Sequence, residues 1–262
     1  MRISVQSFWL PKAGNRLEEY EDAYWPHEPL EGAERARFRC AVADGATETS
    51  FSALWANQLV REYCRHSSLP RFFKTLPRLR REWLEHATAQ PLPWYAEEKV
   101  RSGAFSSLLG LTIERATPEQ NQFASWNVVA VGDSCLFHLR AHRLLTAFPL
   151  ERSEEFNSRP YLLGTNVLGD KRLHGHVIHA RGECAPGDTF YLMTDALACW
   201  FLRYQEAACE DCADMTFDAL AEIRTQEAFA DFVQEQRSQR DAEGKPALRN
   251  DDVTLMRVEI AL

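Results

Sequence analysis

The order of strand-like and helix-like segments is the feature that most restricts the fold of this chain. An apolar run at residues 38–43 ends abruptly in Asp44-Gly45, which is typical of a strand that leads into a turn. Residues 47–66 and 71–89 then carry apolar side chains at helical spacing. Further strands are predicted at 106–113, 128–131, 136–139 and 188–193, a helix at 217–236, and a half-buried alternating strand at 253–260.

Helices therefore come in groups between blocks of strands instead of alternating with single strands. This order disfavours a doubly wound parallel sheet and favours an α+β fold, in which packed sheets carry helix pairs on their outside. The chain has no internal repeat and no Gly/Ser linker, so we expect residues 1–262 to form a single domain.

Composition excludes several classes of function. The formal net charge is −8 at pH 7, whereas nucleic-acid binders and anionic-membrane binders need a cationic face. No apolar run approaches the roughly 18 residues of a membrane span, and the first residues lack a secretory pattern. The 7 cysteines, an odd number, fit reduced thiols. We therefore expect a cytoplasmic protein that binds neither nucleic acid nor membrane.

Carboxylates recur where the predicted strands end or begin. A single aspartate at such a position is ordinary turn chemistry. Several of them, projected from rigid strand ends, can converge on one point, where they repel one another unless a cation neutralises them. An oxygen-rich site without His or Cys suits Mg²⁺ or Mn²⁺ better than zinc. Asp44, Asp133 and Asp195 follow predicted strands, and Asp251 stands immediately before the last one. Glu21 and Asp22 lie in a polar segment near the N-terminus.

Short motifs around these carboxylates resemble those of the type 2C metal-dependent protein phosphatases, and they occur in the same order. They are VADG at 42–45, SGA at 102–104, VGDS at 131–134, LMTD at 192–195 and DDVT at 251–254. The EDA sequence at 21–23 resembles the family's N-terminal acidic motif. The resemblance covers about residues 14–260 and implies a four-layer α-β-β-α sandwich, with two packed antiparallel sheets flanked by helix pairs.

The resemblance also implies roles for the residues around a first metal ion. Asp44 would bridge two ions, and the carbonyl group of Gly45 would help to bind one of them. Asp195 and Asp251 would complete the shell of the first ion. The resemblance therefore makes Asp44, Asp195 and Asp251 the catalytic carboxylates.

Four more residues acquire roles from the same motifs. Glu21 or Asp22 would face the second ion, largely through water. Asp133 would match the ligand of the third ion that many members of the family hold. Arg16 lies about one residue from the place where the family has an arginine that grips the substrate phosphate.

The activity that the resemblance implies is a metal-dependent serine/threonine protein phosphatase. Its cofactors would be Mn²⁺ or Mg²⁺, two or three ions in all, and a metal-activated water would hydrolyse the phosphomonoester. Its partner would be a phosphorylated protein, so that it opposes a kinase. The C-x-x-x-x-x-R loop of cysteine phosphatases is absent around every cysteine, so no cysteine is a predicted nucleophile.

Three departures from the family pattern leave an alternative open. Ala46-Thr47-Glu48 follows Asp44-Gly45 where the family has further glycines, Ala196 stands in place of a glycine, and Phe105 replaces a small hydroxyl residue. If these changes prevent turnover, the domain is a regulatory pseudophosphatase that binds a phosphoprotein. A small phosphomonoester substrate is a further possibility.

Residues 151–181 lie where the family carries a variable flap beside the active site. If this segment selects substrates, exchanging it will change the preference among phosphopeptides and leave hydrolysis of p-nitrophenyl phosphate intact. Steady-state kinetics on both substrates checks this, and loss of both activities would count against the hypothesis.

Overall fold

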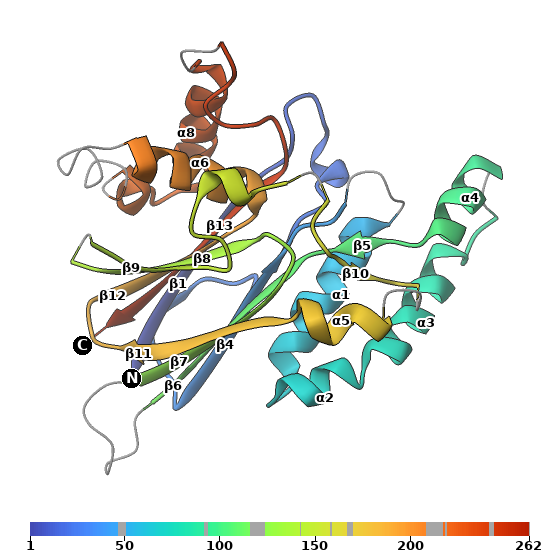
Figure 1. Ribbon diagram of the computed structural model, residues 1–262, viewed down its shortest axis with the longest axis horizontal. Helices are drawn as coiled ribbons and strands as arrows, with labels where there is room; N and C mark the ends of the chain where they lie inside the picture. The colour runs from blue at the N-terminus through green and yellow to red at the C-terminus, as the bar shows by residue number, and fades with distance from the viewer. Residues whose placement is uncertain are drawn as a thin grey trace.

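Two antiparallel sheets packed face to face form the centre of the molecule (Figure 1). The computed structural model describes residues 1–46, 51–91, 94–115, 124–141, 143–157, 159–166, 170–207, 217, 219–240 and 244–261. The larger sheet consists of β3 (Leu30–Glu34), β1 (Arg2–Leu10), β13 (Val253–Ala261), β12 (Asp188–Met193), β8 (Cys135–Arg140) and β9 (Arg143–Phe148), in this order. The smaller consists of β11 (Ile178–Cys184), β7 (Ala124–Val131), β6 (Leu108–Glu114), β4 (Arg37–Ala43) and β2 (Ala23–Trp25).

Helices lie on the outer faces of both sheets. Helices α6 (Asp195–Ala207) and α8 (Gln226–Ser238) pack on the larger sheet, and α1 (Ser52–Arg65) packs on the smaller one. The remaining helices are α2 (Leu69–Phe73), α3 (Leu76–Ala87), α4 (Trp94–Ser102) and α5 (Asp170–His176). The predicted α+β class with packed antiparallel sheets is confirmed. No helix in the described ranges is long and apolar enough to cross a membrane.

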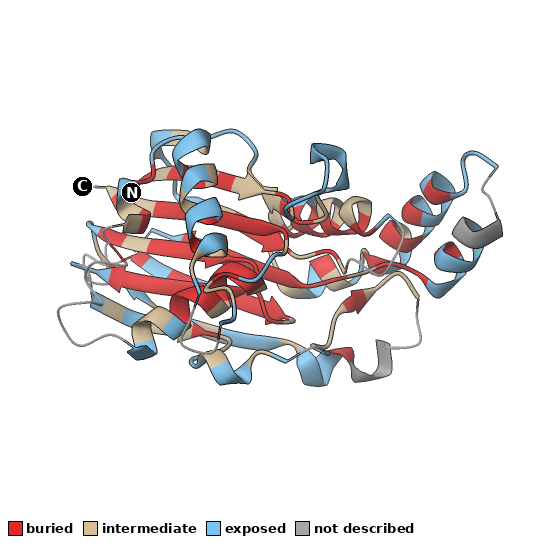
Figure 2. Cartoon of the chain, turned by 90° about the horizontal axis from the view of Figure 1, so that it is seen from above, coloured by how far each residue is buried: buried red, intermediate tan, exposed pale blue. Residues whose placement is uncertain are grey.

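The core lies in three layers, one between the sheets and one under each set of helices. Strand β13 shows how a single strand serves two of them: Met256 and Val258 face the other sheet, whereas Val253 and Leu255 face α6 and α8. The prediction of a half-buried strand here was wrong, because helices cover the second face. Figure 2 shows the buried strands in the middle, with exposed residues on the outer helix faces and loops.

Two predicted helices differ from the structure for local reasons. The helix expected over 71–89 is divided into α2 and α3, because Pro77 in the first turn of α3 has no N–H to continue the ladder of α2. The helix expected over 217–236 begins anew at Gln226, where the Thr225 side chain caps α8 by accepting a hydrogen bond from the N–H of Ala228 at 3.2 Å.

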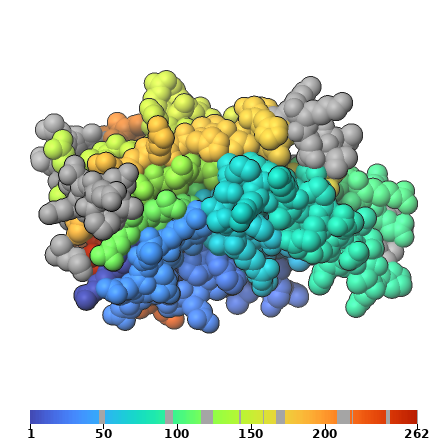
Figure 3. All heavy atoms as spheres, turned by 90° about the horizontal axis from the view of Figure 1, so that it is seen from below, coloured from blue at the N-terminus to red at the C-terminus, as the bar shows by residue number. Residues whose placement is uncertain are grey.

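The helices on the smaller sheet leave part of that sheet uncovered. In Figure 3 the cyan and teal atoms of α1 to α3 lie beside blue and green atoms that belong to the strands. Polar side chains and charged side chains of both signs line the uncovered part, which forms a groove. They include Arg37, Arg39, Thr112, Glu114, Asn127, Arg181 and Glu183.

The segment 151–181 is partly built into the core. Its short strand β10 (Leu163–Gly164) pairs with β5 (Phe105–Ser106), and the Leu163 carbonyl accepts a hydrogen bond from the indole N–H of Trp55 at 2.8 Å. Leu163 and Leu173 are both buried. An exchange that tests substrate choice is therefore best confined to residues 151–157, which precede these buried contacts.

Gly110 of β6 allows helix α1 to approach its sheet closely. A Cβ atom at this position would lie 2.3 to 2.7 Å from three ring atoms of the buried Tyr63. We expect Gly110→Ala to lower the free energy of unfolding by about 1–3 kcal/mol, because the ring and the strand must move apart. Urea denaturation measures this. Gly175→Ala is the control, because a Cβ atom there would meet no atom within 4 Å outside its chain neighbours and its own helix backbone. Equal effects of the two substitutions would contradict the explanation.

Candidate metal centre

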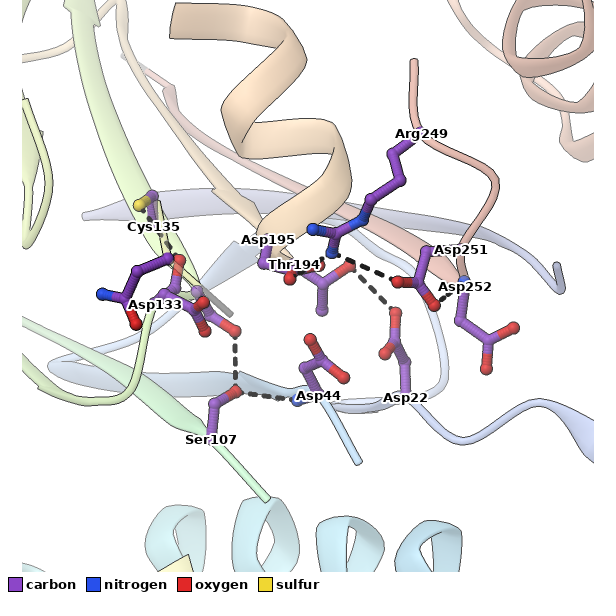
Figure 4. A network of polar contacts seen from close by, with 12 residues as sticks. Asp22, Asp44, Ser107, Asp133, Cys135, Thr194, Asp195, Arg249, Asp251 and Asp252 are labelled. Atoms are coloured by element: carbon purple, nitrogen blue, oxygen red, sulfur yellow. Dashed lines mark hydrogen bonds and ion pairs between the residues drawn. The ribbon is translucent and has the colours of Figure 1, made fainter. Parts of the chain in front are cut away.

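Three aspartates from different strand ends meet at one end of the two sheets (Figure 4). Asp44 follows β4, Asp133 lies between β7 and β8, and Asp195 follows β12 as the first residue of α6. One carboxylate oxygen from each lies within 4.8 Å of the others. The predicted convergence of these three carboxylates is therefore present.

The strand registers explain why distant residues meet here. Within the larger sheet, Met193 at the end of β12 lies opposite Cys135 at the start of β8 and opposite Leu255 near the start of β13. Within the smaller sheet, Ala43 at the end of β4 lies opposite Ala23 at the start of β2. The motifs therefore collect at the same end of the sandwich.

Two serines hold the backbone of Asp44 in place. The N–H of Asp44 donates to the Ser107 hydroxyl at 2.8 Å, and the N–H of Ser107 donates back to the Asp44 carbonyl at 2.8 Å. The hydroxyls of Ser107 and Ser134 lie 2.7 Å apart, and Ser134 follows Asp133 directly. The loops that carry Asp44 and Asp133 are thus joined by hydrogen bonds.

Gly45 is required by a close approach of the N-terminal segment. A Cβ atom on Gly45 would lie 2.5 Å from the backbone oxygen of Glu21 and 3.1 Å from the Cβ of Ser52. The Ser52 hydroxyl also donates to the Glu21 carboxylate. The absence of a side chain at position 45 therefore brings the N-terminal acidic pair next to Asp44.

Asp22, the second member of that pair, is buried among hydroxyl groups. One of its carboxylate oxygens accepts from the Thr194 hydroxyl at 2.9 Å and from the Thr254 hydroxyl at 2.8 Å. The Tyr20 hydroxyl lies 2.5 Å from the Thr254 hydroxyl. Asp22 is thereby connected to β12 and β13, which carry Asp195 and Asp251 at their ends.

Asp252 has a positioning role that the sequence analysis missed. Its two carboxylate oxygens accept from the N–H of Lys12 at 2.7 Å and from the N–H of Glu21 at 2.6 Å. It therefore fastens both ends of the N-terminal loop to the start of β13. The signal in the sequence was the doubled aspartate of the DDVT motif, in which the resemblance gives a role to Asp251 alone.

Asp251 lies beside the three-aspartate cluster, and the same arginine pairs with Asp251 and with Asp195 of the cluster. The Arg249 guanidinium forms an ion pair with Asp195 and a second with Asp251, the latter at 3.1 Å. Sequence analysis did not single out Arg249. A cation two residues before the aspartate pair was the available signal.

Burial and repulsion from neighbouring carboxylates make Asp22, Asp44 and Asp133 difficult to ionise. Burial, reinforced by the charge of Asp252, raises the pKa of Asp22 well above its ordinary value. Burial and the charge of Asp195 do the same to the pKa of Asp44, and they raise the pKa of Asp133 to about 7. A site built of such oxygens fits a divalent cation, which would supply the missing positive charge.

The remaining predicted positions have plain structural descriptions. Arg16 is exposed, with its backbone N–H donating to the Glu19 carboxylate at 2.7 Å, and its role in binding phosphate stays a prediction. Ala196 is an ordinary residue of helix α6, so alanine is not strained there. Ala46 donates its N–H to the Phe105 carbonyl at 2.9 Å. Thr47 and Glu48 lie outside the described residues.

Comparison with known proteins agrees with this arrangement. The sequence model of the family described as Protein phosphatase 2C matches residues 28–250. The chain belongs to this family, as its motifs predicted. No curated protein sequence matches the chain.

Solved structures share the fold over the whole chain. A bacterial serine phosphatase is 13% identical with a TM-score of 0.56, covering 98% of this chain and 97% of that one. The serine/threonine phosphatase PstP of Mycobacterium tuberculosis is 14% identical with a TM-score of 0.54, covering 100% of both chains. RsbX in complex with magnesium is 16% identical with a TM-score of 0.50, covering 99% of this chain and 96% of that one. At these identities the likeness shows the fold alone.

The raised pKa of Asp133 leads to a prediction for the metal-free protein. The pKa rises from 3.8 to about 7 on folding, so the folded state binds the proton more tightly than the unfolded state does. The free energy of unfolding therefore falls as the pH rises through this range. Relative to Asp133→Asn, which cannot titrate, EDTA-treated wild type will lose stability between pH 5 and pH 8. Urea denaturation at both pH values measures the difference. A difference that stays constant or changes in the opposite direction would contradict the prediction.

Proposed function

We propose that the protein is a metal-dependent serine/threonine phosphatase that hydrolyses phosphomonoesters on phosphoproteins. The observation that carries the proposal is the convergence of the Asp44, Asp133 and Asp195 carboxylates within 4.8 Å of one another. Membership of the protein phosphatase 2C family agrees with this chemistry.

The residues around the cluster divide into ligands and supports. Asp44, Asp195 and Asp251 would hold one cation, with the Gly45 carbonyl beside them. Asp44 would also serve a second cation, which Glu21 or Asp22 would face. Asp133 would hold a third. When bound, such cations lower the pKa of a water molecule and neutralise charge on phosphoryl oxygens. Mg²⁺ and Mn²⁺ both suit an oxygen donor set, and the similar RsbX structure contains magnesium.

The supports keep the ligands from moving apart. Ser107 holds the backbone of Asp44, while Thr194 and Thr254 orient the carboxylate of Asp22. Asp252 fastens the loop that carries Glu21. Hydrolysis needs the attacking group and the phosphorus to be aligned, so fixed ligands contribute to the rate by positioning.

The described cysteines do not suit an alternative mechanism with a thiolate nucleophile. Burial raises the pKa of Cys40 and Cys135 well above the ordinary value. It raises the pKa of Cys64 and of Cys184 to about 12. These thiols stay protonated at neutral pH, whereas the deprotonated thiolate is the reactive form.

A regulatory pseudophosphatase is the second candidate, and the position of Arg249 favours it. The guanidinium already neutralises Asp195 and Asp251, two of the proposed ligands of the first cation. If the arginine stays there, the domain recognises a phosphoprotein without turnover. In either case the proposed partner is a phosphoprotein produced by a kinase, with Arg16 contacting its phosphate.

Turnover with and without metal tests the proposal. Purified protein is assayed on p-nitrophenyl phosphate and on a phosphothreonine peptide, in Mn²⁺ and in EDTA. We expect metal-dependent turnover that falls by on the order of 100-fold or more in Asp195→Asn, because one anionic ligand is lost. Asp231→Asn on the exposed face of α8 removes the same charge elsewhere and serves as the control.

The outcomes separate the two candidates. The metal-dependent mechanism would be contradicted by equal turnover in Mn²⁺ and in EDTA. An Asp195→Asn variant as active as the control would also contradict it. A folded protein that binds the phosphopeptide and shows no turnover under any condition would identify the pseudophosphatase.

A further inference from the structure

Arg249 occupies one side of the proposed metal centre as a cation supplied by the chain itself. Its Nη2 atom contacts a carboxylate oxygen of Asp195 and lies 3.1 Å from a carboxylate oxygen of Asp251. Figure 4 shows the guanidinium between these two side chains, on the side of the cluster away from Ser107. In the described part of the chain, the ion pairs found at these aspartates both come from Arg249.

The backbone around Arg249 is firmly held, so the side chain is delivered to this place by the fold. Leu248 is fully buried in the core, and its N–H donates to the Gln236 carbonyl at 3.2 Å. Asn250 accepts from the N–H of Ala13 at 2.8 Å. Arg237 donates to the carbonyl of Asp251. The segment that carries the guanidinium is thus attached on both sides to α8 and to the N-terminal loop.

The guanidinium itself can leave without disturbing the fold. The Arg249 side chain is 53% exposed, whereas the Asp195 and Asp251 side chains are 15% and 31% exposed. A rotation about its side-chain bonds would move the cation into solvent while the backbone stays in place. A bound metal ion would neutralise the same two carboxylates that the arginine neutralises here.

We propose that Arg249 competes with the divalent cation for Asp195 and Asp251, and so sets the metal concentration at which the centre is loaded. The inference rests on the metal centre proposed above. In the metal-free protein the arginine relieves the repulsion among the aspartates. Metal binding has to displace the arginine. Breaking its ion pairs with Asp195 and Asp251 therefore weakens the observed metal affinity.

Metal affinity and metal-free stability test the competition without any assay of turnover. Metal-stripped wild type, Arg249→Gln and Arg203→Gln are titrated with Mn²⁺, with calorimetry and with the EPR signal of free Mn²⁺ as readouts. Arg203 is an exposed residue of α6 and controls for the loss of one positive charge. We expect Arg249→Gln to bind its first Mn²⁺ roughly three- to tenfold more tightly, and the control to bind as wild type does.

Thermal unfolding supplies the second readout. In EDTA, Arg249→Gln should unfold at a lower temperature than wild type, because the carboxylates have lost their counter-charge. Mn²⁺ should then raise its unfolding temperature by more than it raises that of wild type. Arg249→Lys keeps the charge and should bind Mn²⁺ with an affinity between those of wild type and Arg249→Gln.

Each result bears on the inference separately from the proposed function. Unchanged or weaker Mn²⁺ binding by Arg249→Gln would overturn the competition and leave the metal centre standing. Binding by Arg249→Gln but not by wild type would support the competition and favour the pseudophosphatase. If neither binds Mn²⁺, both the competition and the proposed metal centre are wrong.

Discussion

Repulsion among aspartates gathered at one end of the sandwich is the constraint on which the site depends. Asp44, Asp133 and Asp195 bring their carboxylates within 4.8 Å of one another, and Asp22 is buried beside them. Such a cluster is costly unless protons or cations neutralise it. Burial of the large apolar core, in which the strands that carry these residues are fixed, offsets the electrostatic repulsion.

Hydrogen bonds from neighbouring side chains and backbone groups make the cluster specific. Ser107, Thr194 and Thr254 act on Asp44 or Asp22, and Asp252 acts on the backbone of the N-terminal loop. The result is a set of carboxylate oxygens held in place, which is the donor type that hard cations prefer. Arg249 gives two neighbouring carboxylates, those of Asp195 and Asp251, a cationic partner within the chain.

Much of the fold followed from local patterns. The run at 38–43, the helical spacing after residue 50 and the alternation at 253–260 correspond to β4, α1 and β13. Strands β1, β2, β3, β9, β10 and β11 escaped prediction. Strand β1 pairs with β13 along its whole length, a partner about 250 residues away that no local window contains. The burial of both faces of β13 likewise depends on helices packed from elsewhere in the chain.

The sequence by itself determined the family, the α+β class and the positions of Asp44, Asp133 and Asp195 at strand ends, because strand–turn boundaries and short motifs are local. Only the tertiary structure decided which carboxylates meet. Strand registers set that outcome by aligning Met193 with Cys135 and Ala43 with Ala23. The roles of Asp252 and Arg249 also emerged only there, because a carboxylate that fastens Lys12 and a guanidinium that reaches Asp195 act across a long separation in sequence.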